Sequence, residues 1–288
     1  MKHKKLSAVV AFTFALAFSH SSFAQPAPET APATPGAAPA AEVAPSATPA
    51  AAPAAPAAAT ATAGSPEANA LVAKADAIRV PKGSYQFNAV ITSFEGSDKK
   101  SENGYTAYVK DLDHSMVAFT TPTSERGKSL LMLGDDLWIY LPNVKKPVRI
   151  PLQQRLVGDI ANGDITRLNL AGDYNATVAG DENVNGVDTT ALNLVAKSDD
   201  KTYNKIKYWV SKADGKPVKA EYFTVSGQSL KTCMFEDFRP EAGATRPMRM
   251  VFQDSVNKDK KSILVFTDMV TKKLDDNMFT KDYMKTFE

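Results

Sequence analysis

The chain has 288 residues, with 34 Lys or Arg, 32 Asp or Glu and a single cysteine. The nearly balanced charges exclude the strongly basic surface that is typical of nucleic-acid-binding proteins. One cysteine, Cys233, excludes an intramolecular disulfide framework, and its apolar neighbours in the sequence indicate a buried, inert thiol.

The first 24 residues have the pattern of a secretory signal peptide. Lysines at positions 2, 4 and 5 precede the apolar run Leu6–Phe18, and Ser22 and Ala24 supply small residues before a cleavage site. A transmembrane anchor is the alternative, but a span needs about 20 apolar residues, and this run has 13. We therefore expect export to the periplasm, and a mature chain with 31 basic and 32 acidic residues.

Residues 25–66 consist almost entirely of Ala, Pro and Thr. Frequent proline interrupts helices, and alanine offers too little apolar area to build a core. The segment is therefore predicted to be a disordered linker. It serves either as a spacer or as a tether through peptidoglycan, and the tether needs an N-terminal attachment that the sequence does not show.

Residues 67–288 are numerous enough for one domain with its own core. A short amphipathic helix is expected at its start, over Ser65–Ile78, with Ser65 as the N-cap and Pro66 at the first helical position.

Turn residues then recur about every ten positions and separate runs with strand-like alternation. Asn185-Gly186 and Asp214-Gly215 are the strongest hairpin signals, because both dipeptides adopt the positive φ that two-residue turns require. The series predicts an antiparallel meander, with strands over residues 85–94, 104–110, 116–120, 128–133, 137–141, 174–182, 187–196, 205–212, 217–225, 229–238, 247–256 and 261–267.

Two segments lack this alternation. Residues 153–169 predict a loop with a short helix around Ile165–Leu170. Residues 277–287 have apolar side chains at near-helical spacing, which predicts a helix or turn that docks on the sheet.

Several expected strands are apolar on both faces, most clearly Leu130–Leu133 and Leu137–Leu141. A sheet with one face in water alternates, so apolar material must cover both faces of part of this sheet. One interpretation is a closed sandwich or barrel that fills its own interior. The other is a curved, incomplete barrel with a helix and an apolar cavity, which suits acyl chains because each buried methylene contributes about 0.8 kcal/mol.

The segments Gly134–Pro142, with the sequence GDDLWIYLP, and Val148–Pro151, with VRIP, carry a family resemblance. They resemble the outer membrane lipoprotein-sorting protein family, relatives of the periplasmic lipoprotein carrier LolA. The resemblance extends over about residues 80–288. It implies a mainly β fold, in which a single antiparallel curved sheet forms an incomplete (half) β-barrel around short helices and a hydrophobic cavity for acyl chains. Members of this family need not carry lipoproteins.

Eight apolar residues are candidates for contact with a lipid in this cavity: Phe87, Ile91, Phe119, Leu131, Trp138, Tyr140, Phe223 and Phe235. Alternation places some of them on opposite faces, so the sequence does not tell which face lines the cavity. Arg155 and Arg167 lie in the irregular segment and are candidates for holding a loop closed, with an ordinary surface position as the alternative.

Little in the sequence supports an enzyme. His114 is the only histidine after position 24, and one His with one Cys does not make a typical zinc site. No Gly-x-Ser-x-Gly elbow or phosphate-binding glycine loop is present. The pair Asp135-Asp136 suits a turn better than it suits catalytic carboxylates. The sequence therefore predicts a non-enzymatic protein without catalytic residues, metal or cofactor.

The main hypothesis is a periplasmic protein that binds and transfers lipids or lipoproteins through a hydrophobic cavity. Its expected partners are acyl chains and, at either end of the transfer, an inner-membrane transporter or an outer-membrane acceptor. The alternative is a sensor or adaptor module of the same fold that binds and regulates a membrane protein. A purely structural envelope protein is the third hypothesis.

Overall fold

The computed structural model describes residues 64–287. The predicted signal peptide and most of the predicted linker therefore lie outside the described residues. No helix among residues 64–287 is long and apolar enough to cross a membrane.

The described part begins with the predicted helix, α1 (Pro66–Arg79), so this prediction is confirmed to within a residue. The Ser65 hydroxyl caps its first turn by accepting a hydrogen bond from the Ala68 amide at 3.1 Å. At the other end, the guanidinium of Arg246 donates to the carbonyl oxygens of Ala77 and Ile78. Both helix ends are thus satisfied, and α1 is fixed to the strand that carries Arg246.

Thirteen strands form one antiparallel sheet among the described residues. Each of the twelve predicted strands overlaps one of them, and only the short β6 was not expected. Their bounds are β1 (Tyr85–Glu95), β2 (Asp98–Val109), β3 (His114–Thr121), β4 (Ser129–Leu133), β5 (Asp136–Tyr140), β6 (Pro147–Ile150), β9 (Tyr174–Val184), β10 (Val187–Ala196), β11 (Lys205–Ser211), β12 (Pro217–Phe223), β13 (Ser229–Glu241), β14 (Ala244–Asp254) and β15 (Lys260–Thr271).

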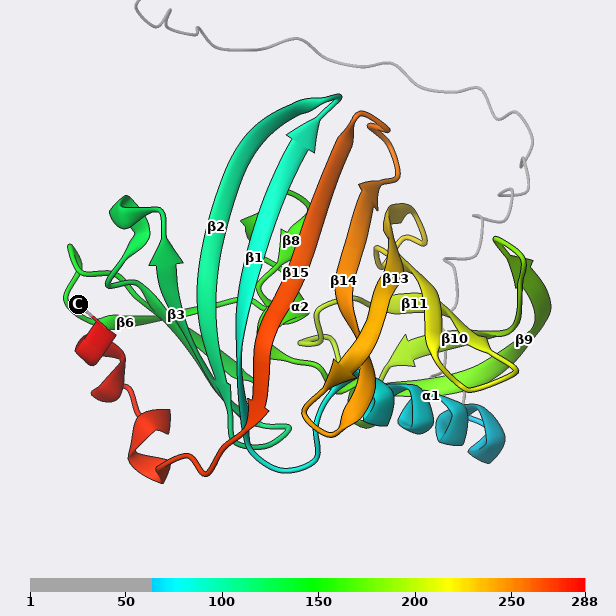
Figure 1. Ribbon diagram of the computed structural model, residues 1–288, viewed down its shortest axis with the longest axis horizontal. Helices are drawn as coiled ribbons and strands as arrows, with labels where there is room; N and C mark the ends of the chain where they lie inside the picture. The colour runs from blue at the N-terminus through cyan, green and yellow to red at the C-terminus, as the bar shows by residue number, and fades with distance from the viewer. Residues whose placement is uncertain (1–63, 288) are drawn as a thin grey trace, which may run out of the picture. The chain divides into compact units, whose positions relative to one another are not determined.

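The order of the strands is that of an opened barrel. It runs β6-β5-β4-β3-β2-β1-β15-β14-β13-β12-β11-β10-β9, so the first and last strands of the chain are neighbours in the middle, and β6 and β9 are the two edges. The two edges are not paired with each other, which confirms the predicted incomplete antiparallel β-barrel. Figure 1 shows the long central strands in front, with β8 and α2 behind them.

The residues between the two edges, 151–173, are called the connector here. It contains β7 (Arg155–Val157), β8 (Ile160–Ala161), α2 (Gly163–Thr166) and α3 (Leu170–Asp173). The predicted helix around Ile165–Leu170 was therefore wrong in its bounds, because two separate turns of helix lie on either side of residues 167–169.

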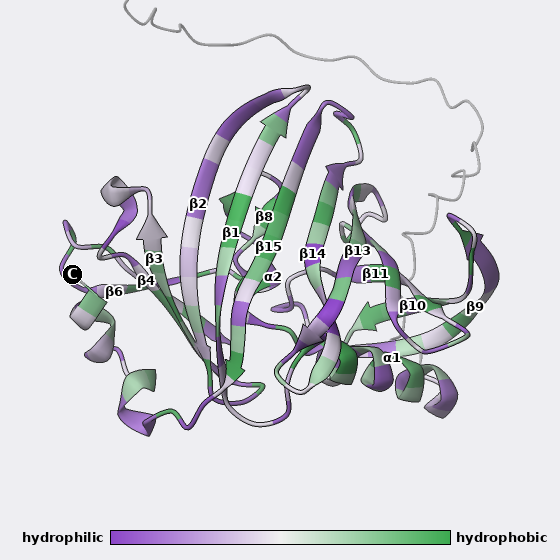
Figure 2. Ribbon diagram, in the orientation of Figure 1, coloured by the Kyte–Doolittle hydropathy of each residue, from purple (hydrophilic) through white to green (hydrophobic). Residues whose placement is uncertain are grey.

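The inner face of the sheet carries the main core. Every second side chain of a strand points inward, as Phe87, Ala89 and Ile91 do in β1, and all three are buried. These inward residues form one apolar cluster with Val72 and Ala75 of α1. Figure 2 shows the corresponding change between apolar and polar residues along β1 and β15.

A second apolar cluster lies on the outer face of β3–β5. Met116, Leu131 and Tyr140 pack there against the C-terminal turns η2 (Asp276–Phe279) and η3 (Tyr283–Phe287). The predicted docking segment over 277–287 is therefore confirmed. The C-terminal segment also covers the outer face of the strands that are apolar on both faces. Their apolar residues are therefore buried by the protein itself and do not require a removable guest.

Cys233 points into the main core and is fully buried. Burial raises the pKa of its thiol above the ordinary value. We expect iodoacetamide to leave Cys233 unmodified in the folded protein at pH 8 and to alkylate it fully in urea, as measured by intact mass. Fast alkylation without denaturant would contradict the inward position of this strand.

Candidate ligand-binding interior

The connector covers the inner face of the sheet and fills part of its interior. Leu152, Ile160 and Ile165 belong to the main apolar cluster and are at most 3% exposed. Around these apolar contacts, polar contacts hold the connector on β15, on β13 and between the two ends of the sheet, and the Ser115 hydroxyl of β3 donates to the Thr166 carbonyl at 2.9 Å.

The first attachment point is the turn between β7 and β8. The Asp159 amide donates to the hydroxyl of Ser262 in β15 at 3.0 Å. Gly158 has a φ of +55°, and a Cβ atom there would come within 2.3 Å of the same hydroxyl. Only glycine allows this close approach without strain, so the turn fits tightly against the inner face.

The second attachment point is a buried ion pair between the connector and β13. Lys231 Nζ donates to Asp164 Oδ2 at 2.7 Å and to the Asp159 carbonyl oxygen. The Lys231 and Asp164 side chains are 5% and 6% exposed. The Tyr203 hydroxyl donates to the same carboxylate at 2.9 Å. A buried carboxylate of α2 thus neutralises a buried lysine of the sheet.

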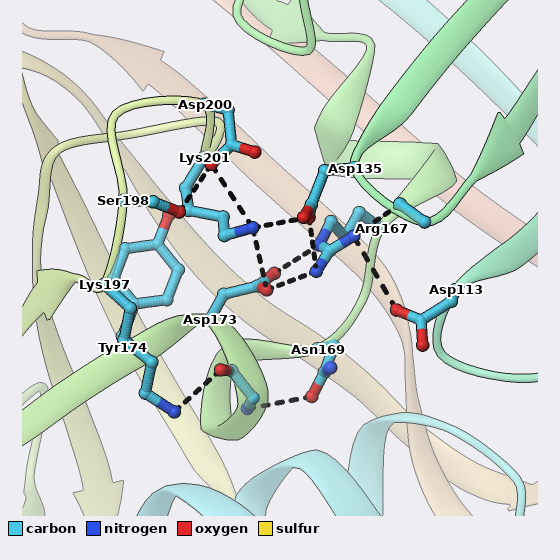
Figure 3. Close-up of polar contacts among 12 residues, drawn as sticks. Asp113, Asp135, Arg167, Asn169, Asp173, Tyr174, Lys197, Ser198, Asp200 and Lys201 are labelled. Carbon is cyan, nitrogen blue, oxygen red and sulfur yellow. Dashed lines mark hydrogen bonds and ion pairs between the residues drawn. The ribbon is translucent and has the colours of Figure 1, made fainter.

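The third attachment point joins the two ends of the open sheet, and we call it the clasp (Figure 3). Arg167 of the connector donates two hydrogen bonds of 2.5 Å to the carboxylate of Asp173, which immediately precedes β9. It also donates to the Gly134 carbonyl in the β4–β5 turn at 2.8 Å. Lys201, from the β10–β11 loop, lies 2.5 Å from Asp135 Oδ1 in the same turn. The clasp therefore links the β4–β5 turn to the β9–β11 end of the sheet.

Helix α1 holds the connector from the side. The carboxylate of Asp76 accepts a hydrogen bond from the Ala171 amide at 2.8 Å and lies 3.0 Å from Arg79. Burial raises the pKa of this carboxyl, and the charge of Arg79 opposes the rise.

Among residues 64–287, three cavities larger than 100 Å³ border the connector, besides a small one of about 30 Å³ beside Arg167 and Asp173. One, of about 400 Å³, lies between α1, the β2–β3 turn and residues 165–171, with apolar walls that include Val80, Val109 and Leu168. A second, of about 440 Å³, lies between Gln153, the β10–β11 loop and the apolar residues Phe223, Val225 and Leu230. A third, of about 170 Å³, lies beside Lys231 and is described below. The two larger volumes lie within the usual range for small-molecule sites, about 300–1,000 Å³.

The eight candidate lipid contacts are divided between different places. Phe87, Ile91, Phe119 and Phe235 lie together in the main cluster on the inner face, and Phe223 lines the 440 Å³ cavity. Leu131, Trp138 and Tyr140 lie instead in the outer cluster, under the C-terminal turns. Lys281 Nζ stands 3.1 Å from the centre of the Trp138 ring, so this ring does not face the interior.

The two candidate arginines also differ. Arg167 is buried in the clasp, with a side chain 6% exposed, whereas Arg155 is exposed in β7. His114 lies partly exposed, with Nδ1 at 2.8 Å from Asp111.

The ion pair between Lys231 and Asp164 was not predicted from the sequence, although the sequence contains one signal for it. Lys231 stands two positions before Cys233, the buried thiol, and residues two apart in a strand share a face. That spacing predicts an inward lysine. A buried lysine needs an anionic partner, so an ion pair was to be expected there.

Comparison with known proteins places the chain in a family. A family model described only as an uncharacterized protein matches residues 111–286. No protein with a curated description matches the sequence.

Solved structures give a closer match. A LolA superfamily protein from Nitrosomonas europaea is 38% identical, with a TM-score of 0.72, over 75% of this chain and 98% of its own. A domain described as an outer membrane lipoprotein-sorting protein, from Vibrio parahaemolyticus, is 20% identical, with a TM-score of 0.65, over 76% and 98%. A DUF1329 family protein from Desulfovibrio piger is also 20% identical, with a TM-score of 0.67, over 76% and 98%. The two 20% matches share the fold, and the 38% match, together with the open sheet, shows that this chain belongs to the LolA superfamily.

Proposed function

We propose that the protein binds and transfers the acyl chains of lipids or lipoproteins in the periplasm, without catalysing a reaction. The observation that carries the proposal is the way the interior is closed. An apolar inner face is covered by a connector of short elements. The connector is attached through a hydrogen bond to Ser262, the pair Lys231–Asp164 and, in the clasp, the hydrogen bond from Arg167 to the Gly134 carbonyl. A guest enters when these contacts break and the connector moves away from the sheet.

The free energies of burial favour replacement of the connector by an acyl chain. Full burial of a chain of about 16 carbons contributes on the order of 12 kcal/mol. Exposing the three large buried apolar side chains of the connector, Leu152, Ile160 and Ile165, costs about 1.5–3 kcal/mol each, or about 5–9 kcal/mol together. The polar contacts that break reduce the remaining difference further, so binding is weak enough to be reversible, which a carrier requires.

Transfer also needs a donor and an acceptor. We propose an inner-membrane transporter and an outer-membrane protein for these roles, in agreement with the predicted export. An adaptor of the same fold would instead form a lasting complex with a membrane protein, and no acyl chain would purify with it.

A tryptophan placed inside the interior tests the proposal. The native Trp138 lies in the outer cluster. Trp209 alternates with the inward Tyr208 and Val210, and the ammonium groups of Lys207 and Lys219 lie 4.8 and 4.6 Å from the centre of its ring. In a variant with Trp138→Phe, Trp209→Phe and Phe119→Trp, we expect a brominated fatty acid to quench the fluorescence strongly.

The native protein is the matched control, because its tryptophans lie on the other face and should be quenched weakly by the same acid. Native mass spectrometry of protein purified from its own periplasm, followed by solvent extraction, should also detect a bound lipid. Absence of quenching in a correctly folded variant, together with absence of extractable lipid, would reject the carrier function.

A further inference from the structure

The buried ion pair at Lys231 indicates which class of guest the interior accepts, and this inference rests on the proposed function. Lys231 is 4% exposed and projects from the inner face among the rings of Tyr203, Tyr222 and Phe252, with Nζ 4.6–5.4 Å from their centres. An apolar side chain would fill this place without the cost of removing a charge from water. The sheet nevertheless carries a cation there.

The oxygen atoms that neutralise Lys231 come from the connector. Among the described residues, Nζ has two hydrogen-bond acceptors, Asp164 Oδ2 at 2.7 Å and the Asp159 carbonyl oxygen. The same movement that opens the interior therefore removes both acceptors. A buried lysine without an anion is costly, so a guest that supplies an anion at this position is favoured over one that does not.

The structure has space for that anion beside Lys231. A cavity of about 170 Å³ is lined by Lys231, Asp159 and Asp254, and also by Arg155. Arg155 is exposed and forms no ion pair within residues 64–287. A guanidinium binds carboxylates and phosphates well, so a second cation is available at the same cavity.

Space for an apolar chain adjoins this cavity. The 440 Å³ cavity shares the walls Gln153, Tyr203 and Leu230 with it and adds Phe223 and Val225. Val225 is 84% exposed and Leu230 41% exposed, so apolar side chains are presented to solvent next to the two cations.

We propose that the guest is an amphiphile with an anionic head, a carboxylate or a phosphate, which binds Lys231 with the help of Arg155. In the closed structure the Asp164 carboxylate occupies the position of that head and keeps the site blocked until a guest displaces it. An uncharged acylated molecule gains the burial of its chain but leaves Lys231 without an anion, so it binds more weakly.

Two probes with the same hydrocarbon chain separate the contribution of the head-group charge from that of the hydrocarbon chain. Palmitate carries a carboxylate, and hexadecanol is uncharged at the same length. We expect the wild-type protein to bind palmitate more tightly than hexadecanol in a competition assay with a fluorescent acyl probe. Monopalmitoyl phosphate, measured in parallel, tells whether a carboxylate or a phosphate is preferred.

Variants of Lys231 and Asp164 then test whether this ion pair causes the preference for palmitate over hexadecanol. Asp164→Asn removes the internal competitor, and we expect it to strengthen palmitate binding by about tenfold or more while hexadecanol binding changes much less. Lys231→Met should remove the preference for palmitate, and Lys231→Arg should keep it. Lys207→Met, on the outer face beside Trp209, is the matched control and should behave as the wild type does.

The results separate this inference from the proposed function. Equal affinity of the wild type for both probes, with no gain for Asp164→Asn, overturns the anionic-head inference and leaves acyl-chain binding intact. An equal loss of both probes in Lys231→Met, with Lys231→Arg losing the preference as well, reduces Lys231 to a structural role and also overturns it. If no probe binds any folded variant, the proposed function fails.

Discussion

A disulfide between the β7–β8 turn and β15 is expected to abolish acyl-chain binding, and its reduction is expected to restore it. A Cβ atom built on Gly158 lies 3.4 Å from the Cβ of Ser262, close to the 3.5–4.5 Å found in native disulfides. A cysteine at position 158 keeps the positive φ of Gly158 at a cost of about 1–2 kcal/mol, and Ser262→Cys replaces the hydroxyl that its Cβ would meet. The double variant therefore locks the connector onto the inner face when it is oxidised. Under the proposed function a guest enters only when the connector moves away, so we expect the locked form to give it no access to the interior.

The reduced variant is the control for the oxidised one. A Cβ at position 158 also lies 2.9 Å from the Cβ of Ser93, so the variant also carries Ser93→Gly to make space. The native Cys233 is fully buried and does not compete for pairing. Affinity is measured with a fluorescent acyl probe before and after addition of dithiothreitol. Unchanged binding in the oxidised form, with the disulfide verified by mass spectrometry, would show that the interior is not the binding site.

The strands of this protein follow directly from local sequence. At the predicted hairpin Asn185-Gly186, both residues have positive φ, +51° and +86°, as a two-residue turn requires. Alternation then sets the register between neighbouring strands, because a slip by one residue would turn every side chain to the other face. The incomplete barrel followed from the family resemblance, since a series of hairpins alone is equally compatible with a closed barrel.

The candidate site was less predictable because alternation does not identify what covers each face. Trp138 and Ile139 are consecutive in β5, and Ile139 packs against the inner cluster while Trp138 packs against the outer one. The cover of Trp138 is the C-terminal turn with Lys281, more than 100 residues away in sequence. Such a contact leaves no pattern in the local sequence. The eight residues predicted to contact a lipid therefore lie on both faces of the sheet.

Arg167 shows the same limitation for charged residues. Its partners come from the β4–β5 turn, from the residue before β9 and, through Asp135, from the β10–β11 loop. The irregular segment that contains Arg167 was recognised in the sequence. The fact that its middle lies between the two ends of an open sheet depends on the tertiary structure alone.

Replacement of Arg167 by methionine is expected to lower the free energy of unfolding by about 3–5 kcal/mol. The Arg167 and Asp173 side chains are 6% and 7% exposed, so the substitution leaves a buried carboxylate without its bidentate partner. Hydrogen bonds with Asp173 raise the pKa of the guanidinium even though burial opposes its charge, which is the expected sign for a pair that stabilises the ionised state. Urea unfolding followed by circular dichroism measures the loss.

Three further variants, Arg155→Met, Asp173→Asn and the double variant of Arg167→Met with Asp173→Asn, separate the loss of the pair from a loss of side-chain volume. Arg155→Met makes the same chemical change at an exposed position of the connector, and we expect it to change the free energy of unfolding by less than about 0.5 kcal/mol. Adding Asp173→Asn to Arg167→Met removes the unpaired charge, so part of the lost stability should return. If the double variant is as unstable as the sum of the single ones, the two residues do not interact, and the clasp does not hold the two ends of the sheet together.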